Sequence, residues 1–454
     1  MRILRLPLLV AFCAVLPCLP LIHTASAESR GYTPPHAADA RSEPVRFPEE
    51  LAADRLAALR TRNSAYLGLA RFDALESEAA RLMLDYSARR ITADEFADCA
   101  AAFAPLFGGE ADIPQLQAWT EAYPRSYMAW YALGREYLEL AMNPRGGGAA
   151  YAARGQSDAV AKYAEQASVA LNHSLELSVR PLPSLVSLMS VQAYGGPFEF
   201  DPARKVAGAA CNPADTSRET GRRLCGRSWH DVQYQILQAV VRMDPDAVAG
   251  YAAYFTFNSP RWGGKYAHLR EVVTTARQNS RTAPAALAEI QALELGWEAS
   301  DARDPMREAD LYIQAFDANP RPGHLRRLYD AADAAKHARN IPFALKIYDR
   351  IIQIRPEEHE ALFERAERSE EEYHDHSRLF TDLAESARLG MKESQNRIGY
   401  AYLTGYNGFP VDLQEARRWF TLAANQGYQH SRDKLPVVDE LIAEQARKAA
   451  VGKR

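Results

Sequence analysis

The chain is poor in cysteine, in long apolar runs and in net charge. It holds 5 cysteines in 454 residues and carries a formal net charge of −4. Beyond the N-terminal segment, no stretch approaches the ~18 consecutive apolar residues of a transmembrane helix. A mildly acidic chain also lacks the basic surface that nucleic-acid binding requires. We therefore expect neither a membrane span nor a nucleic-acid partner.

Motifs that carry catalysis are also missing. No HExxH, CxxC, GxSxG or GxxxxGK[ST] pattern occurs in the sequence. His374 and His376 stand two positions apart among acids. On a helix such side chains point about 200° apart, so one metal ion could bind both only in an extended segment. We assign no catalytic, cofactor-binding or metal-binding residue and expect no cofactor.

The N-terminus has the features of a secretory signal. Two arginines precede an apolar run that ends in the small residues Ala25, Ser26 and Ala27. Cys18 raises the alternative of a lipid anchor, but Pro17 stands where a lipoprotein signal needs a small residue. We expect cleavage after residue 27, a periplasmic or secreted mature chain, and a flexible lead-in over 28–48.

Three cysteines remain in the mature chain. Cys211 and Cys225 flank a loop-like, polar stretch, and we predict a disulfide between them. Closing that loop would contribute roughly 3 kcal/mol in the chain-entropy model. Cys99 lies in an alanine-rich helical stretch and is expected to be a packed thiol rather than a nucleophile.

Helical periodicity dominates from Leu51 onward. Pro124 is followed by Trp130, Leu133, Gly134 and Tyr137, at the spacing of a tetratricopeptide repeat. This pattern predicts a hairpin of two helices that stacks on its neighbours.

The same tetratricopeptide spacing recurs between Glu289 and Pro356, where it predicts two further hairpins. Gly296 is expected to let two helices approach closely, and Pro320 and Pro356 are expected to end hairpins. The stretch resembles two tandem tetratricopeptide units.

The clearest pattern lies in residues 394–431. Gly399 and Gly405 precede a Gly/Asn/Pro loop, and Trp419 and Phe420 then provide a bulky stripe before Gly427. The small residues of the first helix allow a second helix to approach closely, and the bulky side chains of the second helix pack into that groove. Gly427 suits the left-handed residue that ends a helix. The stretch resembles the Sel1-like repeat family, which implies another stacked helical hairpin.

The central region departs from a regular repeat. Its helices are interrupted by glycine-rich loops over 143–157 and 258–266. The stretch from Phe72 to Ser280 resembles an uncharacterised bacterial family of helical-repeat type, which adds nothing about chemistry.

Together these patterns predict an all-α protein whose tetratricopeptide-like and Sel1-like hairpins form an α-solenoid. We expect five parts: a signal peptide (1–27), the lead-in (28–48), a central helical domain of unknown function (49–285), tetratricopeptide-like hairpins (286–370), and a Sel1-like repeat with a C-terminal helix (371–454).

Six aromatic or arginine residues are candidates for binding. Arg261 beside Trp262 could pair with a carboxylate while presenting an aromatic surface, and tyrosines combine contact area with a polar tip. In every case, packing between hairpins is the alternative. The candidates are Trp130, Tyr137, Arg261, Trp262, Tyr402 and Trp419.

The expected function is a non-enzymatic scaffold or adaptor of the bacterial cell envelope that binds a polypeptide on the concave face of stacked hairpins. One alternative is a periplasmic immunity or inhibitor protein. Another is an enzyme acting on peptidoglycan or glycans, which would need two acids facing one pocket. The sequence leaves the partner and the oligomeric state open.

Overall fold

A computed structural model describes residues 34–105, 109–142, 157–194, 223–224, 227–374 and 376–451. The predicted signal peptide, the proposed Cys211–Cys225 disulfide and the 143–156 loop lie outside these residues.

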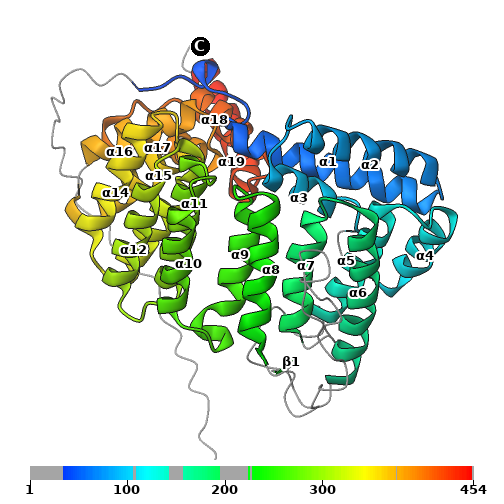
Figure 1. The fold of residues 1–454 in the computed structure, drawn as a ribbon. Coiled ribbons are helices and arrows are strands. Elements are labelled where there is room, and N and C mark those ends of the chain that lie inside the picture. The colour runs from blue at the N-terminus through cyan, green and yellow to red at the C-terminus, as the bar shows by residue number, and fades with distance from the viewer. Residues whose placement is uncertain are drawn as a thin grey trace, which may run out of the picture.

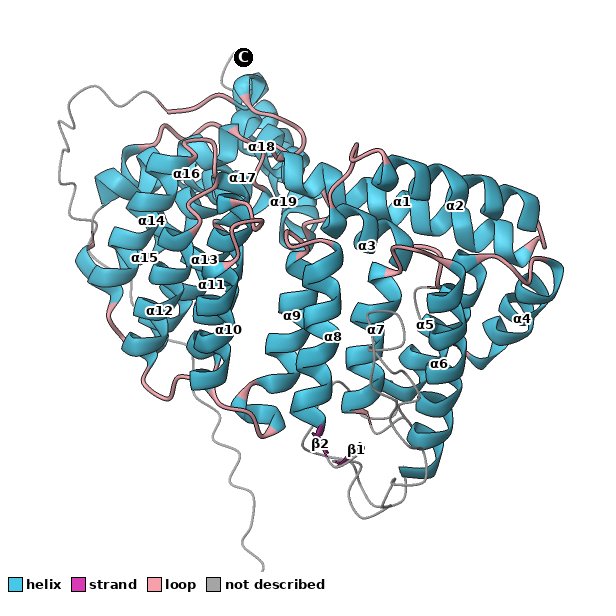
Figure 2. Cartoon of the chain, viewed as in Figure 1, coloured by secondary structure: helices cyan, strands magenta, loops and turns pink. Residues whose placement is uncertain are grey.

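Helices make up almost all of the described chain (Figures 1 and 2). The first half contains α1 (Pro48–Gly68), α2 (Phe72–Ser87), α3 (Ala93–Ala101), α4 (Ile113–Ala122), α5 (Tyr127–Met142), α6 (Ser157–Leu177), α7 (Leu182–Ala193), α8 (Trp229–Met243) and α9 (Val248–Asn258).

The second half contains α10 (Tyr266–Gln278), α11 (Pro284–Ser300), α12 (Pro305–Ala318), α13 (Arg326–His337), α14 (Ile341–Ile354), α15 (His359–Tyr373), α16 (His376–Arg388), α17 (Lys392–Thr404), α18 (Leu413–Asn425) and α19 (Gln429–Val451). Short 3₁₀ turns are η1 (Ala37–Asp39), η2 (Glu110–Asp112), η5 (Pro260–Trp262), η6 (Pro322–His324) and η7 (Tyr406–Gly408). The strands in the described residues, β1 (Arg223–Leu224) and β2 (Arg227–Ser228), form a two-residue antiparallel pair.

From α4 onward, the helices pack chiefly on helices one or two positions away along the chain, and α9 packs mainly on α7 and α11. In Figure 1 the helices from α5 to α12 stand side by side, with α1 and α2 lying across one end. The fold is therefore the all-α solenoid that the periodicity predicts. Among the described residues, no helix is both long and apolar enough to cross a membrane.

Glycine allows close helix contact where the sequence predicts it, with one exception. A Cβ atom at Gly134 would lie 2.7 Å from Leu171, and one at Gly399 would lie 2.9 Å from Phe420. Gly405 and Gly427 have left-handed backbones, as expected for helix ends. The expectation for Gly296 is wrong, because no atom lies within 4 Å of its Cβ position.

The predicted tetratricopeptide-like hairpins are the pairs α11–α12 and α13–α14. Pro320 and Pro356 follow the second helix of each pair, as expected. Buried apolar side chains form separate clusters. Ile290 on α11 belongs to the cluster of the first half, and α12 begins the next cluster, around Phe316. The boundaries between the predicted parts stay a prediction, because α11 packs on both sides.

Residues 34–47, which we call the N-terminal strap, cross the C-terminal hairpins (Figure 1). The Tyr402 hydroxyl donates to the carbonyl of Pro35 (2.8 Å), and the Ala37 amide donates to Glu415 Oε2 (2.9 Å). Farther along, the backbone amide of Arg41 donates to the carbonyl of Arg388 (3.0 Å). This docking was not predicted, since the sequence there has no periodicity.

Gly390 lies directly under the N-terminal strap. Its φ is 101°, and a Cβ atom there would lie 2.2 Å from the carbonyl oxygen of Glu43. Only a residue without a side chain lets the strap approach this closely.

We predict that Gly390→Ala weakens the docking of the strap. Gly427→Ala is the matched control, because its φ is 85° and its Cβ position is open. The control should lose about 1 kcal/mol of unfolding free energy from backbone strain. Gly390→Ala should lose roughly twice that or more, measured by urea denaturation, with faster hydrogen exchange at the Arg41 amide. Equal losses and unchanged exchange would contradict the contact.

Candidate functional site

A row of charged side chains runs along α13. Arg326, Asp330, Asp333 and Lys336 are spaced by four, three and three residues, so they share one face of the helix. The opposite face buries Leu328 and four alanines. The helix thus presents a continuous polar surface beside its packing surface.

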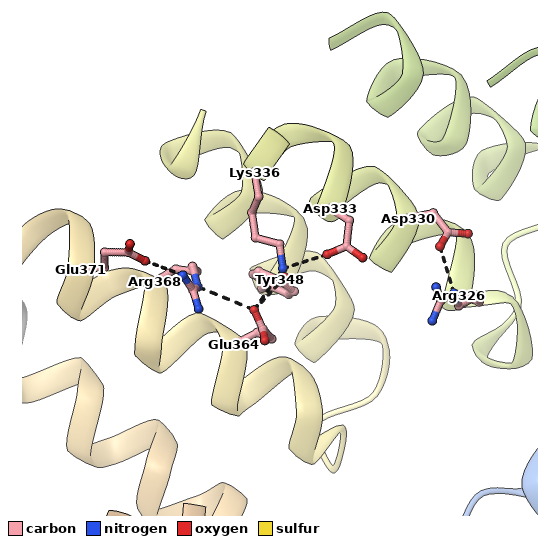
Figure 3. Close-up of polar contacts among 8 residues, drawn as sticks. All are labelled: Arg326, Asp330, Asp333, Lys336, Tyr348, Glu364, Arg368 and Glu371. Carbon is pink, nitrogen blue, oxygen red and sulfur yellow. Dashed lines mark hydrogen bonds and ion pairs between the residues drawn. The ribbon is translucent and has the colours of Figure 1, made fainter. Parts of the chain in front are cut away.

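Charged groups of α15 meet this row through Lys336 (Figure 3). The Lys336 ammonium lies 2.8 Å from Asp333 Oδ1 and 3.2 Å from Glu364 Oε2. Tyr348 of α14 donates its hydroxyl to Glu364 as well (3.3 Å). Burial alone would lower the pKa of Lys336, but the Asp333 carboxylate, Tyr348 and Glu364 raise it. The lysine therefore stays charged.

Arg368 extends the network to the end of α15. It lies 3.7 Å from Glu364 and pairs with Glu371. We call these eight residues the polar face: Arg326, Asp330, Asp333, Lys336, Tyr348, Glu364, Arg368 and Glu371 (Figure 3).

The edges of the polar face are open to solvent. The side chains of Arg326 and Glu371 are 79% and 62% exposed, whereas Lys336 and Glu364 are 27% and 23% exposed. Ion pairs this exposed add about 0–1 kcal/mol each to stability. The outer groups keep hydrogen-bonding capacity for a partner while the inner groups are mutually paired.

A pocket of about 720 Å³ lies where five turns between helices meet. These are the turns α2–α3, α6–α7, α8–α9, α10–α11 and α12–α13. Its charged lining comprises Arg89, Arg90, Asp94, Glu95, Arg180, Asp244, Asp246, Arg281, Glu289, Arg321 and His324.

Two of the acids cap helices other than their own. Asp94 of α3 accepts a hydrogen bond from the Ala249 amide at the start of α9 (2.7 Å). Asp246 accepts one from the Ala283 amide at the start of α11 (2.6 Å). These bonds satisfy helix N–H groups that lack a partner within the helix. They also tie α3 to α9 and α9 to α11 across the pocket.

Asp244 is held by two side chains from other turns. The Tyr86 hydroxyl and the Arg180 guanidinium each lie 3.2 Å from Asp244 Oδ2. The guanidinium also lies 4.4 Å above the centre of the Tyr86 ring. Burial and the Asp244 carboxylate raise the pKa of Tyr86 above its ordinary value. The tyrosine stays a hydrogen-bond donor.

Glu289 completes the series on α11. It accepts hydrogen bonds from Asn319 Nδ2 (2.8 Å) and Arg327 (2.5 Å), which connects α11 to the start of α13. Glu95 accepts from the Thr92 amide in the capping box of α3 (2.8 Å). Every acid of the pocket therefore has a partner within the protein.

The six residues proposed from sequence lie apart from this pocket. Trp130 is partly buried, donates to the Pro124 carbonyl (3.0 Å) and meets His173 edge-on. Tyr137 is buried, and its hydroxyl accepts from Gln117 (3.1 Å).

Arg261 and Trp262 share η5, but each has an internal partner. Arg261 Nε lies 2.5 Å from Asp301 Oδ1. Trp262 packs edge-on against Phe257 and Tyr194, with ring centres 5.1 and 5.7 Å away. This geometry matches the packing alternative for the loop.

Tyr402 and Trp419 belong to the core of the Sel1-like hairpin, with exposed fractions of 2% and 0%. A partner could reach them only if the hairpin rearranged. The binding role of the six residues stays a prediction. The pocket was not predicted from sequence, because its arginines come from turns that are far apart in the chain. The available signal was an arginine in a turn, such as Arg321 between Pro320 and Pro322.

Cys99 is free and partly buried. Burial, with Asp98 and Glu95 nearby, raises its pKa, so its thiolate is disfavoured at neutral pH. Within the described stretches, no group of three or more His, Cys, Asp or Glu side chains could hold a metal ion.

Burial raises the pKa of Asp94 from 3.8 to about 6. A carboxyl with a raised folded-state pKa contributes its full stability below pH 3.8 and loses it as pH rises through about 6. We predict that Asp94→Asn, which keeps the acceptor for Ala249, flattens this part of the stability curve. Urea denaturation from about pH 4 to about pH 8 measures it. The control is Asp39→Asn, an exposed carboxyl outside the pocket. If Asp94→Asn and wild type follow parallel curves, the assignment is wrong.

Comparison with protein families finds the Sel1 repeat at residues 392–428, which covers α17, η7 and α18. No curated protein sequence matches the chain.

Among solved structures, 30 chains match. One is described as "Circular tandem repeat protein with novel repeat topology and enhanced subunit contact surfaces". It is 13% identical, the alignment covers 89% of this chain and 92% of that chain, and the TM-score is 0.25. At that score the likeness carries no conclusion about this chain. The Sel1-like hairpin is thus confirmed by sequence, and the resemblance of the central region to an uncharacterised family stays a prediction.

Proposed function

We propose that the protein is a non-enzymatic scaffold of the bacterial cell envelope that binds a polypeptide along the face formed by α13 and α15. The observation that carries this proposal is the polar face, an array of paired charges with exposed edges on successive helices. Stacked hairpins leave extended surfaces of this kind, which suit an extended or helical peptide.

The Sel1 repeat also supports a role as a scaffold. Its aromatic and small residues pack between α17 and α18, where Phe420 lies against Gly399. The hairpin therefore extends the stack rather than supplying chemistry.

The envelope location rests on the sequence of residues 1–27 alone. A periplasmic immunity or inhibitor protein is a narrower form of the same proposal, and the identity of the partner decides between them.

We predict that a photo-crosslinking residue placed at Asp333 captures a polypeptide in the envelope fraction of cells expressing the full chain. Asp333 is 50% exposed on the polar face. The control position is Lys346, which is exposed on α14 and outside the polar face. Capture at Asp333 and not at Lys346 would support the proposal. Equal labelling at both positions, or recovery of the chain only in the cytosol with residues 1–27 attached, would contradict it.

A second candidate function has one observation in its favour. Asp94 and Asp244 line the same pocket, and the pKa of Asp94 is raised to about 6, as a general acid requires. Both carboxylates are engaged in structural hydrogen bonds. The Asp94→Asn variant decides the matter: hydrolysis of peptidoglycan by the wild type that this variant abolishes would establish an enzyme, and no hydrolysis by the wild type would remove it.

A further inference from the structure

Three arginines of the pocket have no acidic partner. Arg89, Arg281 and Arg321 are exposed and line the pocket, and none pairs with a carboxylate within the described ranges. Arg281 donates one long hydrogen bond, 3.4 Å, to the carbonyl of Arg242. The other two arginines differ: Arg90 pairs with Asp85 at 2.6 Å, and Arg180 pairs with Asp244.

These arginines come from three separate turns. Arg89 follows α2, Arg281 lies between α10 and α11, and Arg321 lies between α12 and η6. Sequence positions so far apart reach one pocket only because the stacked helices bring their turns to the same end. The convergence is therefore a property of the fold.

The acids of the same pocket hold other partners. Asp94 and Asp246 cap helices, Asp244 holds Arg180 and Tyr86, and Glu289 holds Arg327 and Asn319. The acceptors are engaged while three guanidinium groups keep their donors. A guanidinium has five N–H donors and no acceptor, in a fork that matches a carboxylate.

The start of α11 also borders the pocket. This helix has 17 residues, and its N-cap residue Ala283 supplies no side-chain acceptor. Ala285 and Ala286 of its first turn line the pocket, as do Arg281 and Arg321. The N-terminal end of α11 therefore borders the same space, with its Ala283 amide bonded to Asp246.

The pocket lies close in sequence to the start of the polar face. Arg321 and His324 line the pocket, and α13 begins at Arg326, the first residue of the polar face. A chain bound along α13 would enter the pocket at its end. The pocket volume of about 720 Å³ lies within the ~300–1,000 Å³ typical of ligand sites.

We infer that the pocket binds an acidic segment of the polypeptide partner, with carboxylates of that segment on Arg89, Arg281 and Arg321. This inference rests on the proposed scaffold function and adds the charge of the partner and the residues that read it.

The test compares short synthetic peptides that alternate Glu with Gly or Ser, and the same peptides with Gln or Lys in place of Glu. Binding to the full mature chain is measured by fluorescence anisotropy. The variant is Arg89→Gln/Arg281→Gln/Arg321→Gln. The control is Arg303→Gln/Arg339→Gln, which removes two exposed arginines outside the pocket. Arg339 is matched to Arg89, because their φ values are 57° and 56°.

The Glu peptide should bind, and the Gln and Lys peptides should bind at least about tenfold more weakly. The triple variant should lose about tenfold or more of the affinity for the Glu peptide, and the control should keep it. Affinity should fall as salt rises, since exposed charges are screened.

Undiminished binding of the Glu peptide to the triple variant would overturn the inference. So would inorganic phosphate or free glutamate binding as tightly as the peptide, because the site would then recognise a small anion. If the partner captured from Asp333 is not displaced by the Glu peptide, the inference fails while the scaffold stands. If no polypeptide is captured at all, the scaffold itself fails.

Discussion

Three hairpins of the structure depend on close contact between a glycine on one helix and a large side chain on its hairpin partner. Gly134 accepts Leu171, Gly250 accepts Val240, and Gly399 accepts Phe420. In each case an added Cβ atom would lie under 3.0 Å from the partner side chain. Such contacts fix how the two helices of a hairpin cross, because packed interiors do not yield to an added methyl group. Once each hairpin is fixed, the stack and the position of its turns follow.

The turns are then joined by hydrogen bonds that cross from one hairpin to another. Asp94 caps α9, Asp246 caps α11, and Glu289 reaches the turn before α13. Each bond satisfies helix or turn groups that would otherwise be open to solvent. The same bonds engage the acids of the pocket, and the lining arginines that pair with no carboxylate in the described residues are Arg89, Arg281 and Arg321. The electrostatic preference of the site is in this way a by-product of how the turns are held together.

Much of the fold could be predicted, because its signals are local. The spacing of Trp419 and Phe420 against Gly399, and the left-handed Gly405 and Gly427, belong to a single hairpin and are visible in a few dozen residues. The prediction of close helix contact at Gly296 was wrong, because a motif position does not show whether the neighbouring helix is near.

The site could not be predicted in the same way. The N-terminal strap contacts residues more than 300 positions away, such as Glu415, and no local pattern encodes that contact. The pocket likewise gathers Arg89, Arg281 and Arg321 from distant turns. The sequence suggested aromatic residues as binding candidates. In the structure, Tyr402 and Trp419 are packed in the core, where large apolar surfaces contribute most.

The central claim is that a polypeptide lies along α13 and ends in the arginine-lined pocket. Hydrogen exchange of the full chain with and without its bound partner tests it most directly. The account predicts slower exchange in α13, in α15 and in the turns that carry Arg89, Arg281 and Arg321, with unchanged exchange in α14. Protection confined to other helices, or no protection anywhere on saturation with the partner, would contradict it.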